Sequence, residues 1–130
     1  MYIITISDRS SAKLTPILFK QLSYEAQVGV LGHELSHVAD FSGMKLSGLI
    51  RLGFGHLSRR YIDRFEYRTD SLCIEHGLGK YLLAWSIFVR KALHINDWQG
   101  ADSINTPLTG RERYMNPATI ERRMRAKERK

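Results

Sequence analysis

The sequence predicts a single α+β domain that is mainly helical, with one short strand at its N-terminus. Residues 2–7 (YIITIS) are mostly β-branched or aromatic and end at the turn-forming run DRSS, as a strand does. Several later segments carry the apolar spacing of helices. With 130 residues, of which 43% are apolar, the chain has room for one hydrophobic core. We therefore expect one domain over residues 1–130.

The first predicted helix begins after Ser23, a residue type that caps helix N-termini, and ends at Gly43, which suits a left-handed C-terminal position. His33 and His37 lie on one face of this helix. Roughly opposite is an apolar stripe that we expect to face the core. This stripe consists of Val28, Leu31, Leu35 and Val38.

Two further helices are predicted in the middle of the chain. Residues 58–76 form the second helix, which stops at Gly77. Its inner stripe consists of Tyr61, Phe65, Thr69 and Leu72. Residues 80–95 form the third helix, which is apolar nearly all round and is therefore expected to be a buried central element. Residues 44–57 are apolar but broken by three glycines; they predict a loose helix and turn covering the histidine pair, with a membrane-touching surface as the alternative.

The C-terminal twenty residues carry most of the net charge. Residues 96–116 are rich in turn formers, and Asn116 followed by Pro117 then opens a final helix over about residues 116–130. Eight basic and three acidic residues give residues 111–130 a net charge of +5, out of +7 for the whole chain. We interpret this stretch as a solvated helix end, with binding to nucleic acid or to an anionic membrane surface as the alternative.

Cys73 is the single cysteine, so an internal disulfide is excluded, which favours a reducing compartment or a protein indifferent to redox conditions. It lies among apolar residues, which predicts a small core residue. Residues 1–11 lack the features of a signal peptide, and the longest apolar stretch, residues 81–89, is about half as long as a membrane span requires. We therefore expect a cytoplasmic protein.

Residues 28–43, VGVLGHELSHVADFSG, contain two histidines four residues apart, with a glutamate beside the first. Side chains four apart lie one helical turn above each other, so His33 and His37 can both direct a ring nitrogen to one metal ion, at about 2.0–2.1 Å. Glu34 lies about 60° round the helix from His37, close enough to reach a water on that metal. This is the position of a general base, because the metal lowers the pKa of its water toward about 7.

The composition of this chain would produce the His-Glu-x-x-His pattern by chance in about one such chain in a hundred. Gly29, Gly32 and Ser36 surround the histidines, as expected where a metal and a substrate approach a helix closely. A purely structural pair of histidines is the alternative interpretation.

A catalytic zinc usually has three protein ligands and one open position, so a third ligand is required. The best candidate lies in residues 65–70 (FEYRTD), where Glu66 and Asp70 are again four apart. Glu66 borders the inner stripe of its helix, and a half-buried carboxylate there needs a partner, which zinc would be. Asp70 can accept the free ring N–H of a ligating histidine and fix its tautomer. The alternatives for the third ligand are Glu75, Asp63 and His76.

These five residues, His33, Glu34, His37, Glu66 and Asp70, resemble the motif of the gluzincin zinc metallopeptidases. In that family the HExxH helix is joined by a glutamate from a later helix, with an aspartate four residues on. The resemblance implies a minimal zincin fold with Zn²⁺ as cofactor. It also implies that the strand at residues 2–7 forms the rim along which an extended substrate lies.

Other segments indicate which branch of the zinc peptidases the chain resembles most. Residues 114–124 (YMNPATIERRM) look like the proline-plus-arginine segment of the CAAX-prenyl-protease branch, and the size is similar to that of the minigluzincins. That branch has several transmembrane helices and small residues around its aspartate, where this chain has Arg68 and Thr69. The metzincin pattern is excluded because Asp40 and Gly43 stand where it requires Gly and His. The candidates for the family's transition-state-stabilising side chain are Tyr114, Tyr81 and His76.

We therefore expect a zinc-dependent metalloendopeptidase that hydrolyses peptide bonds with a metal-activated water. Its substrate is a protein or peptide; nucleic acid is not an expected partner, and a peripheral membrane contact is left open. The alternative is a catalytically silent module of the same fold whose basic C-terminus binds nucleic acid or a membrane surface. In a third hypothesis, residues 111–130 fold back over the cleft and keep the enzyme latent.

Overall fold

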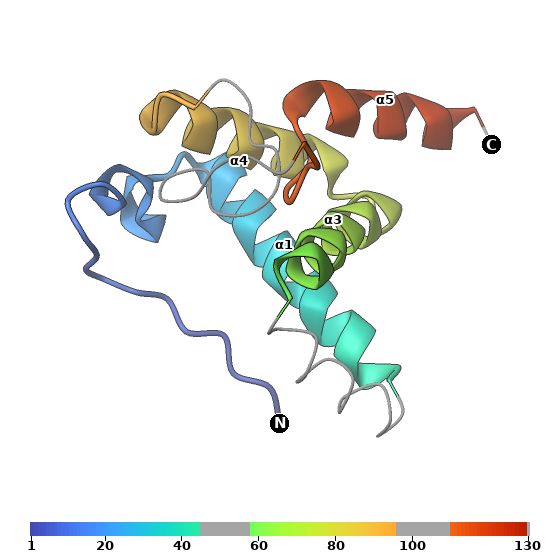
Figure 1. The fold of residues 1–130 in the computed structure, drawn as a ribbon, viewed down its shortest axis with the longest axis horizontal. Helices are drawn as coiled ribbons and strands as arrows, with labels where there is room; N and C mark the ends of the chain where they lie inside the picture. The colour runs from blue at the N-terminus through green and yellow to red at the C-terminus, as the bar shows by residue number, and fades with distance from the viewer. Residues whose placement is uncertain (45–57, 96–109, 130) are drawn as a thin grey trace.

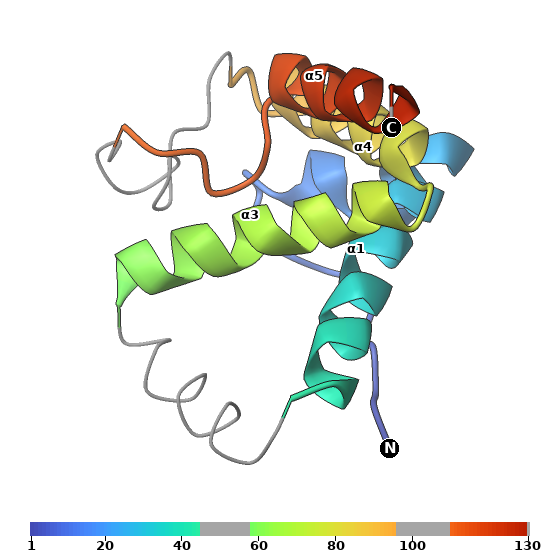
Figure 2. The ribbon, with the colours of Figure 1, turned by 90° about the vertical axis from the view of Figure 1, so that its right-hand side faces the viewer.

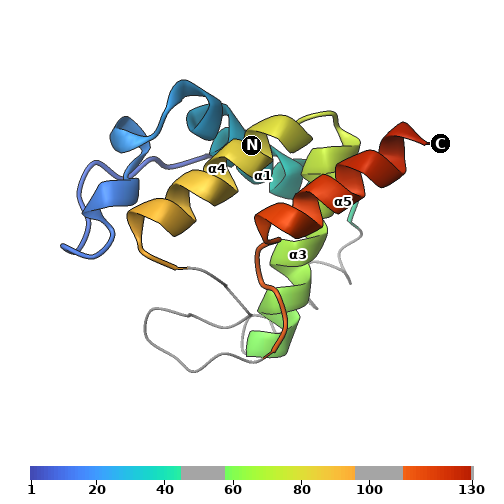
Figure 3. The same cartoon turned by 90° about the horizontal axis from the view of Figure 1, so that it is seen from above.

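The computed structural model describes residues 1–44, 58–95 and 110–129, and within these ranges it contains helices and no strand. In chain order the elements are η1 (Thr15–Ile17), η2 (Phe19–Gln21), α1 (Tyr24–Ser42), α3 (Arg59–Glu75), α4 (Gly79–Ala92) and α5 (Pro117–Glu128). Helix α4 packs most extensively on α1 and also contacts α3, α5 and η1. Figure 1 shows α1 running obliquely below α4, and Figure 2 shows α3 in side view, with its C-terminal part crossing α1. In Figure 3, α4 and α5 lie side by side and run in opposite directions.

The predicted N-terminal strand is wrong, and with it the α+β fold class. Residues 2–7 pair with no other described segment, and Figure 1 draws them as an irregular stretch without a strand arrow. Ile3 is 76% exposed and Ile6 52% exposed. β-Branched residues favour extended backbone, but a strand also needs a partner for its N–H and C=O groups, and the described residues offer none. The described part of the chain is an all-helical domain.

The helix ends at Ser23 and Gly77 follow local signals, whereas the end at Gly43 does not, and α4 ends at Ala92 instead of the predicted residue 95. Ser23 caps α1 as predicted: its hydroxyl oxygen accepts the backbone N–H of Ala26 at 3.3 Å. Gly77, after α3, has the left-handed φ of +84° that favours glycine. Gly43 was predicted to adopt a left-handed conformation as well, but its φ is −87°, so α1 ends in ordinary right-handed backbone.

The core lies between α3, α4 and the start of α5, and α4 is the central helix, as predicted. The buried side chains of this core are Cys73, Ile74, Leu82, Met115 and Ile120. Cys73 is a free, buried cysteine, which confirms the prediction of a small core residue. Because Met115 and Ile120 belong to the core, removal of residues 111–130 would take away part of the fold.

The buried face of α1 differs from the predicted one. Leu35, in the predicted apolar stripe, is 56% exposed, whereas the buried positions are Ala26, Gly29, Gly32, His33 and Ser36. A Cβ atom at Gly29 would collide with the carbonyl oxygen of Tyr81, so α1 and α4 cross too closely there for a side chain. A Cβ at Gly32 would lie 2.7 Å from Cδ1 of Leu78. These glycines serve close helix packing, and the idea that they make room for a metal and substrate is wrong.

The basic C-terminal helix packs against the rest of the domain. The Lys127 ammonium donates to the carbonyl oxygens of Ile74 at 3.1 Å and Glu75 at 2.8 Å, the last residues of α3. Cations are favourable at this end of a helix, because its carbonyls lack helical partners and carry partial negative charge. Part of the basic stretch therefore joins α5 to α3. Residues 45–57 and 96–109 lie outside the described residues. The first range contains most of the loose helix and turn that were predicted to cover the histidine pair.

Candidate metal centre

His33 and His37 project from one side of α1, because they are four residues apart on a continuous helix. Their ring centroids are 4.8 Å apart and the ring planes are nearly perpendicular. His33 is 1% exposed, while His37 is partly exposed and borders a cavity. The two imidazoles thus occupy the boundary between the helical core and a hollow in the surface.

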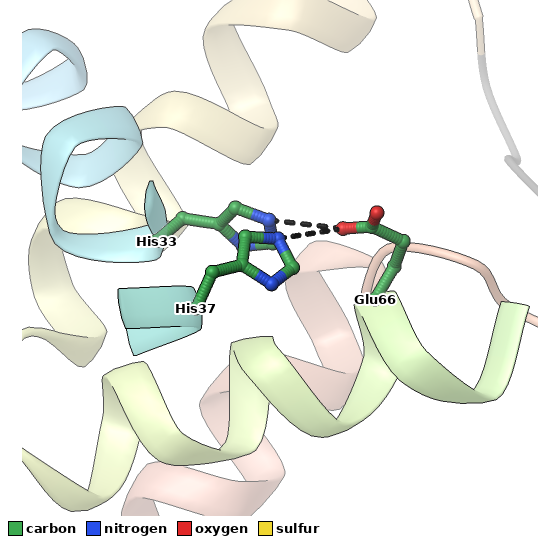
Figure 4. Close-up of side chains that lie close together, drawn as sticks. All are labelled: His33, His37 and Glu66. Atoms are coloured by element: carbon green, nitrogen blue, oxygen red, sulfur yellow. Dashed lines mark hydrogen bonds and ion pairs between the residues drawn. The ribbon is translucent and has the colours of Figure 1, made fainter. Parts of the chain in front are cut away.

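Glu66 reaches both histidines from α3 (Figure 4). Its Oε2 atom lies 3.1 Å from Nε2 of His33 and 3.3 Å from Nε2 of His37. Two ligands bound tetrahedrally to zinc, each at about 2.0–2.1 Å, are about 3.3 Å apart. One ligand atom from each of the three residues lies within 4.8 Å of the others. The three side chains therefore already have the spacing of a metal-binding group, and no large side-chain movement is needed to bring them together.

Asp70 fixes the orientation of His33. Its Oδ1 lies 2.8 Å from Nδ1 of His33, and its Oδ2 accepts the backbone N–H of Met115 at 2.7 Å. An ionised carboxylate only accepts hydrogen bonds, so Nδ1 of His33 carries a proton and Nε2 is the atom that faces Glu66. The contact between Asp70 and His33 is the one predicted from the sequence.

Thr69 plays the corresponding part for His37, and sequence reasoning missed this role. Its hydroxyl donates to the carbonyl oxygen of Phe65 at 3.1 Å, so the hydroxyl oxygen accepts from Nδ1 of His37, also at 3.1 Å. Both imidazoles are thereby held with Nδ1–H turned away and Nε2 toward Glu66. The signal was present in the sequence, since Thr69 and Asp70 follow Glu66 by three and four residues on one helix.

The electrostatics of the group favour a cation between the ligands. Burial lowers the pKa of His33, but its hydrogen bonds and charge interactions with Asp70 and Glu66 outweigh burial and raise it to about 9. Burial raises the pKa of Glu66, whereas His33 and His37 together bring it down to about 2. In the metal-free protein a proton on Nε2 of His33 therefore supplies the positive charge that a metal ion would supply.

The donor set matches the chemistry of zinc. Two imidazole nitrogens and one carboxylate oxygen form a three-ligand set of the kind found at catalytic zinc ions, which leaves the fourth position open. The acids around His33 would balance the charge of a divalent cation, and each ligating histidine has the hydrogen-bond partner that such ligands need. The residues present therefore fit a zinc ion.

Glu34, the predicted base, lines a cavity of about 560 Å³ beside the histidines. His37, Asp70 and Tyr114 line the same cavity, together with apolar residues of α1, α4 and the N-terminal segment. Residues 2–7 border it too, although they form no strand. A substrate in this cavity would lie against Glu34 and the exposed side of the ligand group.

The three competing candidates for the third ligand lie elsewhere. Asp63 is buried and pairs with Arg113, whose Nε lies 2.8 Å from its Oδ1. Glu75 and His76 are exposed at the far end of α3. Within the described residues, the group that has metal-ligand spacing contains Glu66 and none of these three.

No protein-family model, curated protein or solved structure matches this chain. Of the described helices, none is both long enough and apolar enough to cross a bilayer.

Proposed function

We propose that this chain is a small zinc-dependent endopeptidase. The observation that carries the proposal is the convergence of Nε2 of His33, Nε2 of His37 and Oε2 of Glu66. Asp70 and Thr69 strengthen it, because they hold both imidazoles in the tautomer that a metal ligand needs. A buried salt-bridge network alone would not require the second histidine to be oriented in this way.

In this proposal His33, His37 and Glu66 hold the zinc ion, which when bound makes a water molecule acidic enough to act as a nucleophile near neutral pH. Glu34 takes the proton from the attacking water and passes it to the leaving amine. Asp70 keeps the first histidine in place during the reaction. The apolar walls of the cavity hold an extended peptide and exclude bulk water.

The motif residues follow one another along this chain in the same order as in the gluzincins, which supports the same activity. The α+β architecture that the resemblance implied is absent from the described residues. A free thiol such as that of the buried Cys73 is typical of proteins in a reducing compartment, and we infer a cytoplasmic location from it. The rival hypothesis, a silent module that binds nucleic acid or membrane through its basic C-terminus, is left as an outcome of the test. So is latency.

The test compares zinc-loaded wild type with Glu34→Gln on a mixture of fluorogenic peptides. Glu25→Gln is the matched control, because Glu25 is an exposed acid on the same helix. We expect both variants to bind zinc like wild type. Only Glu34→Gln should lower kcat/KM, by about 100-fold or more, because it removes the general base. Cleavage that Glu34→Gln leaves unchanged would refute the mechanism.

If zinc-loaded wild type cleaves nothing, an active peptidase is excluded, which leaves the latent enzyme and the silent module. That module should then bind DNA or anionic vesicles with an affinity that falls steeply as salt rises.

A further inference from the structure

A second hollow, of about 360 Å³, lies between α3 and the turn before α5. In Figure 3 the segment before α5 runs alongside the first half of α3. The hollow is lined by Asp63, Arg64, Tyr67, Arg111 and Glu112, none of which lines the cavity beside the histidines. Residues two apart on a helix point about 200° apart, so Arg64 and the proposed ligand Glu66 lie on opposite sides of α3. The hollow is therefore separate from the candidate metal centre.

The two acids in the wall of this hollow are held by other parts of the protein. The buried Asp63 accepts from Nε of Arg113 at 2.8 Å. Glu112 accepts hydrogen bonds from the backbone N–H and the side-chain amide of Asn116, and from the hydroxyl of Thr119 at 2.8 Å. Both carboxylates are thus engaged within the fold, and neither pairs with the exposed arginines that share the hollow.

Those arginines are free to bind a ligand. Arg64, from α3, and Arg111, from the turn before α5, are exposed and make no hydrogen bond or ion pair with any residue that the structure describes. Cations of α5 differ in this respect, because Arg125 pairs with Glu121 and Lys127 donates to the end of α3. Two unpaired guanidinium groups therefore line one hollow.

Tyr67 brings a hydroxyl and a third cation to the same place. Its ring packs against the core, and Cζ of Arg123 lies over the ring, 5.7 Å from its centroid. The hydroxyl has no hydrogen-bond partner within the described ranges of the chain. Side chains from α3, α5 and the turn before α5 thus surround the hollow with donors.

The charge around the hollow selects the class of ligand. Four arginines and two acids line or border it, which leaves a net charge of +2. Guanidinium groups bind the oxygens of phosphate and carboxylate groups through paired N–H donors. A phosphoryl group carries a charge of about −1.5 to −2 near neutral pH and three acceptor oxygens, whereas a carboxylate carries a single charge. The phosphoryl group is the better match.

We propose that this hollow binds a phosphoryl group, with Arg64 and Arg111 as its charged partners and the hydroxyl of Tyr67 as a further donor. The group belongs either to free phosphate or to a phosphorylated side chain, and the chemistry of recognition is the same for both. The site does not depend on the proposed peptidase function.

The test titrates the full chain with three probes by isothermal calorimetry in about 150 mM NaCl, which screens nonspecific attraction. The probes are inorganic phosphate, acetate and a short neutral peptide with one phosphoserine. The variants are Arg64→Gln, Arg111→Gln and Tyr67→Phe. Arg125→Gln is the matched control, because it removes the same charge from an exposed position on α5. Thermal unfolding is measured for every variant.

We expect wild type to bind one phosphate per chain. Each arginine variant should bind phosphate at least about 10-fold more weakly, because it loses charge-assisted hydrogen bonds, and Tyr67→Phe at least about 3-fold more weakly. Arg125→Gln should stay within about 2-fold of wild type, and acetate should bind at least about 10-fold more weakly than phosphate. A phosphopeptide that binds more tightly than phosphate would identify a phosphorylated side chain as the source, and any other order would identify free phosphate.

Several results would overturn the proposal. Wild type that binds neither phosphate probe would do so, as would phosphate binding that both arginine variants retain, because phosphate would then bind elsewhere, for example to a zinc ion. Acetate that binds as tightly as phosphate would refute the class of ligand. An arginine variant that unfolds would show that this arginine is structural. Zinc content and peptide cleavage test the proposed function separately, so either proposal can fail without the other.

Discussion

Replacement of Asp70 by Asn tests the orientation of His33 most sharply. The carboxylate accepts two hydrogen bonds through different oxygens, from Nδ1–H of His33 and from the backbone N–H of Met115. An asparagine has one acceptor oxygen and one donor NH₂ group in their place. Whichever way the amide is turned, one of the two N–H donors loses its acceptor.

The expected size of the effect follows from this mismatch. Asp70 is 1% exposed, so a donor left unsatisfied there costs about 1–3 kcal/mol of unfolding free energy. If His33 instead shifts its proton to Nε2 to accept from the amide, that nitrogen can no longer bind a metal. We therefore expect the zinc affinity of Asp70→Asn to fall by about 10- to 100-fold, as for other partners of ligating histidines.

Two assays separate these effects. Urea unfolding of the metal-free protein gives the loss of stability, and competition with a chelator gives the dissociation constant for zinc. Asp63→Asn is the control, because Asp63 is an equally buried carboxylate of α3 that pairs with Arg113 instead of a histidine. It should lose stability and keep its zinc affinity. Equal loss of zinc affinity in both variants, or none in Asp70→Asn, would show that Asp70 does not orient His33 for zinc binding.

Three further predictions follow from contacts of α1. Thr69→Val removes the acceptor of Nδ1–H of His37 at nearly constant volume and should weaken zinc binding by about 10-fold, measured by the same competition. Zinc binding at pH 7.5 should release about one proton, since the pKa of about 9 keeps His33 protonated in the metal-free protein, and apparent zinc affinity should rise with pH up to about 9. Calorimetry in buffers of different ionisation enthalpy measures this release, and a heat independent of buffer would contradict it. Gly29→Ala should lower the unfolding free energy by about 1–3 kcal/mol or more, because the new Cβ meets the Tyr81 carbonyl, and a urea midpoint equal to that of wild type would disprove the close crossing.

Much of the helical layout could be predicted from local signals. Ser23, Gly77 and Pro117 mark helix boundaries through their own backbone and capping preferences, and the helices end where these residues predict. That Glu66 and Asp70 share one face of α3 could be predicted as well, because residues four apart on a helix are neighbours. Their approach to His33 was expected from the need of a zinc ion for a third ligand and from the gluzincin motif.

What depends on tertiary packing could not be predicted. A strand requires a partner, and the β-branched composition of residues 2–7 carries no information about whether one exists. The apolar stripe of α1 that includes Leu35 pointed away from the buried side, because close packing on α4 uses the small residue Gly29 instead of large apolar side chains. The bond from Met115 to Asp70 joins residues 45 positions apart, and no local pattern encodes it.

The proposed zinc site consists of His33, His37 and Glu66. Its most direct test is the metal content, by mass spectrometry, of untagged wild type beside Glu66→Ala, with Glu75→Ala as control because Glu75 is an exposed acid near the end of the same helix. We expect about one tightly bound zinc per chain in wild type and in the control, and loss or strong weakening of binding in Glu66→Ala. Wild type that binds no zinc even when zinc is supplied, or Glu66→Ala that retains it as tightly as wild type, would show that these three residues do not form a zinc site.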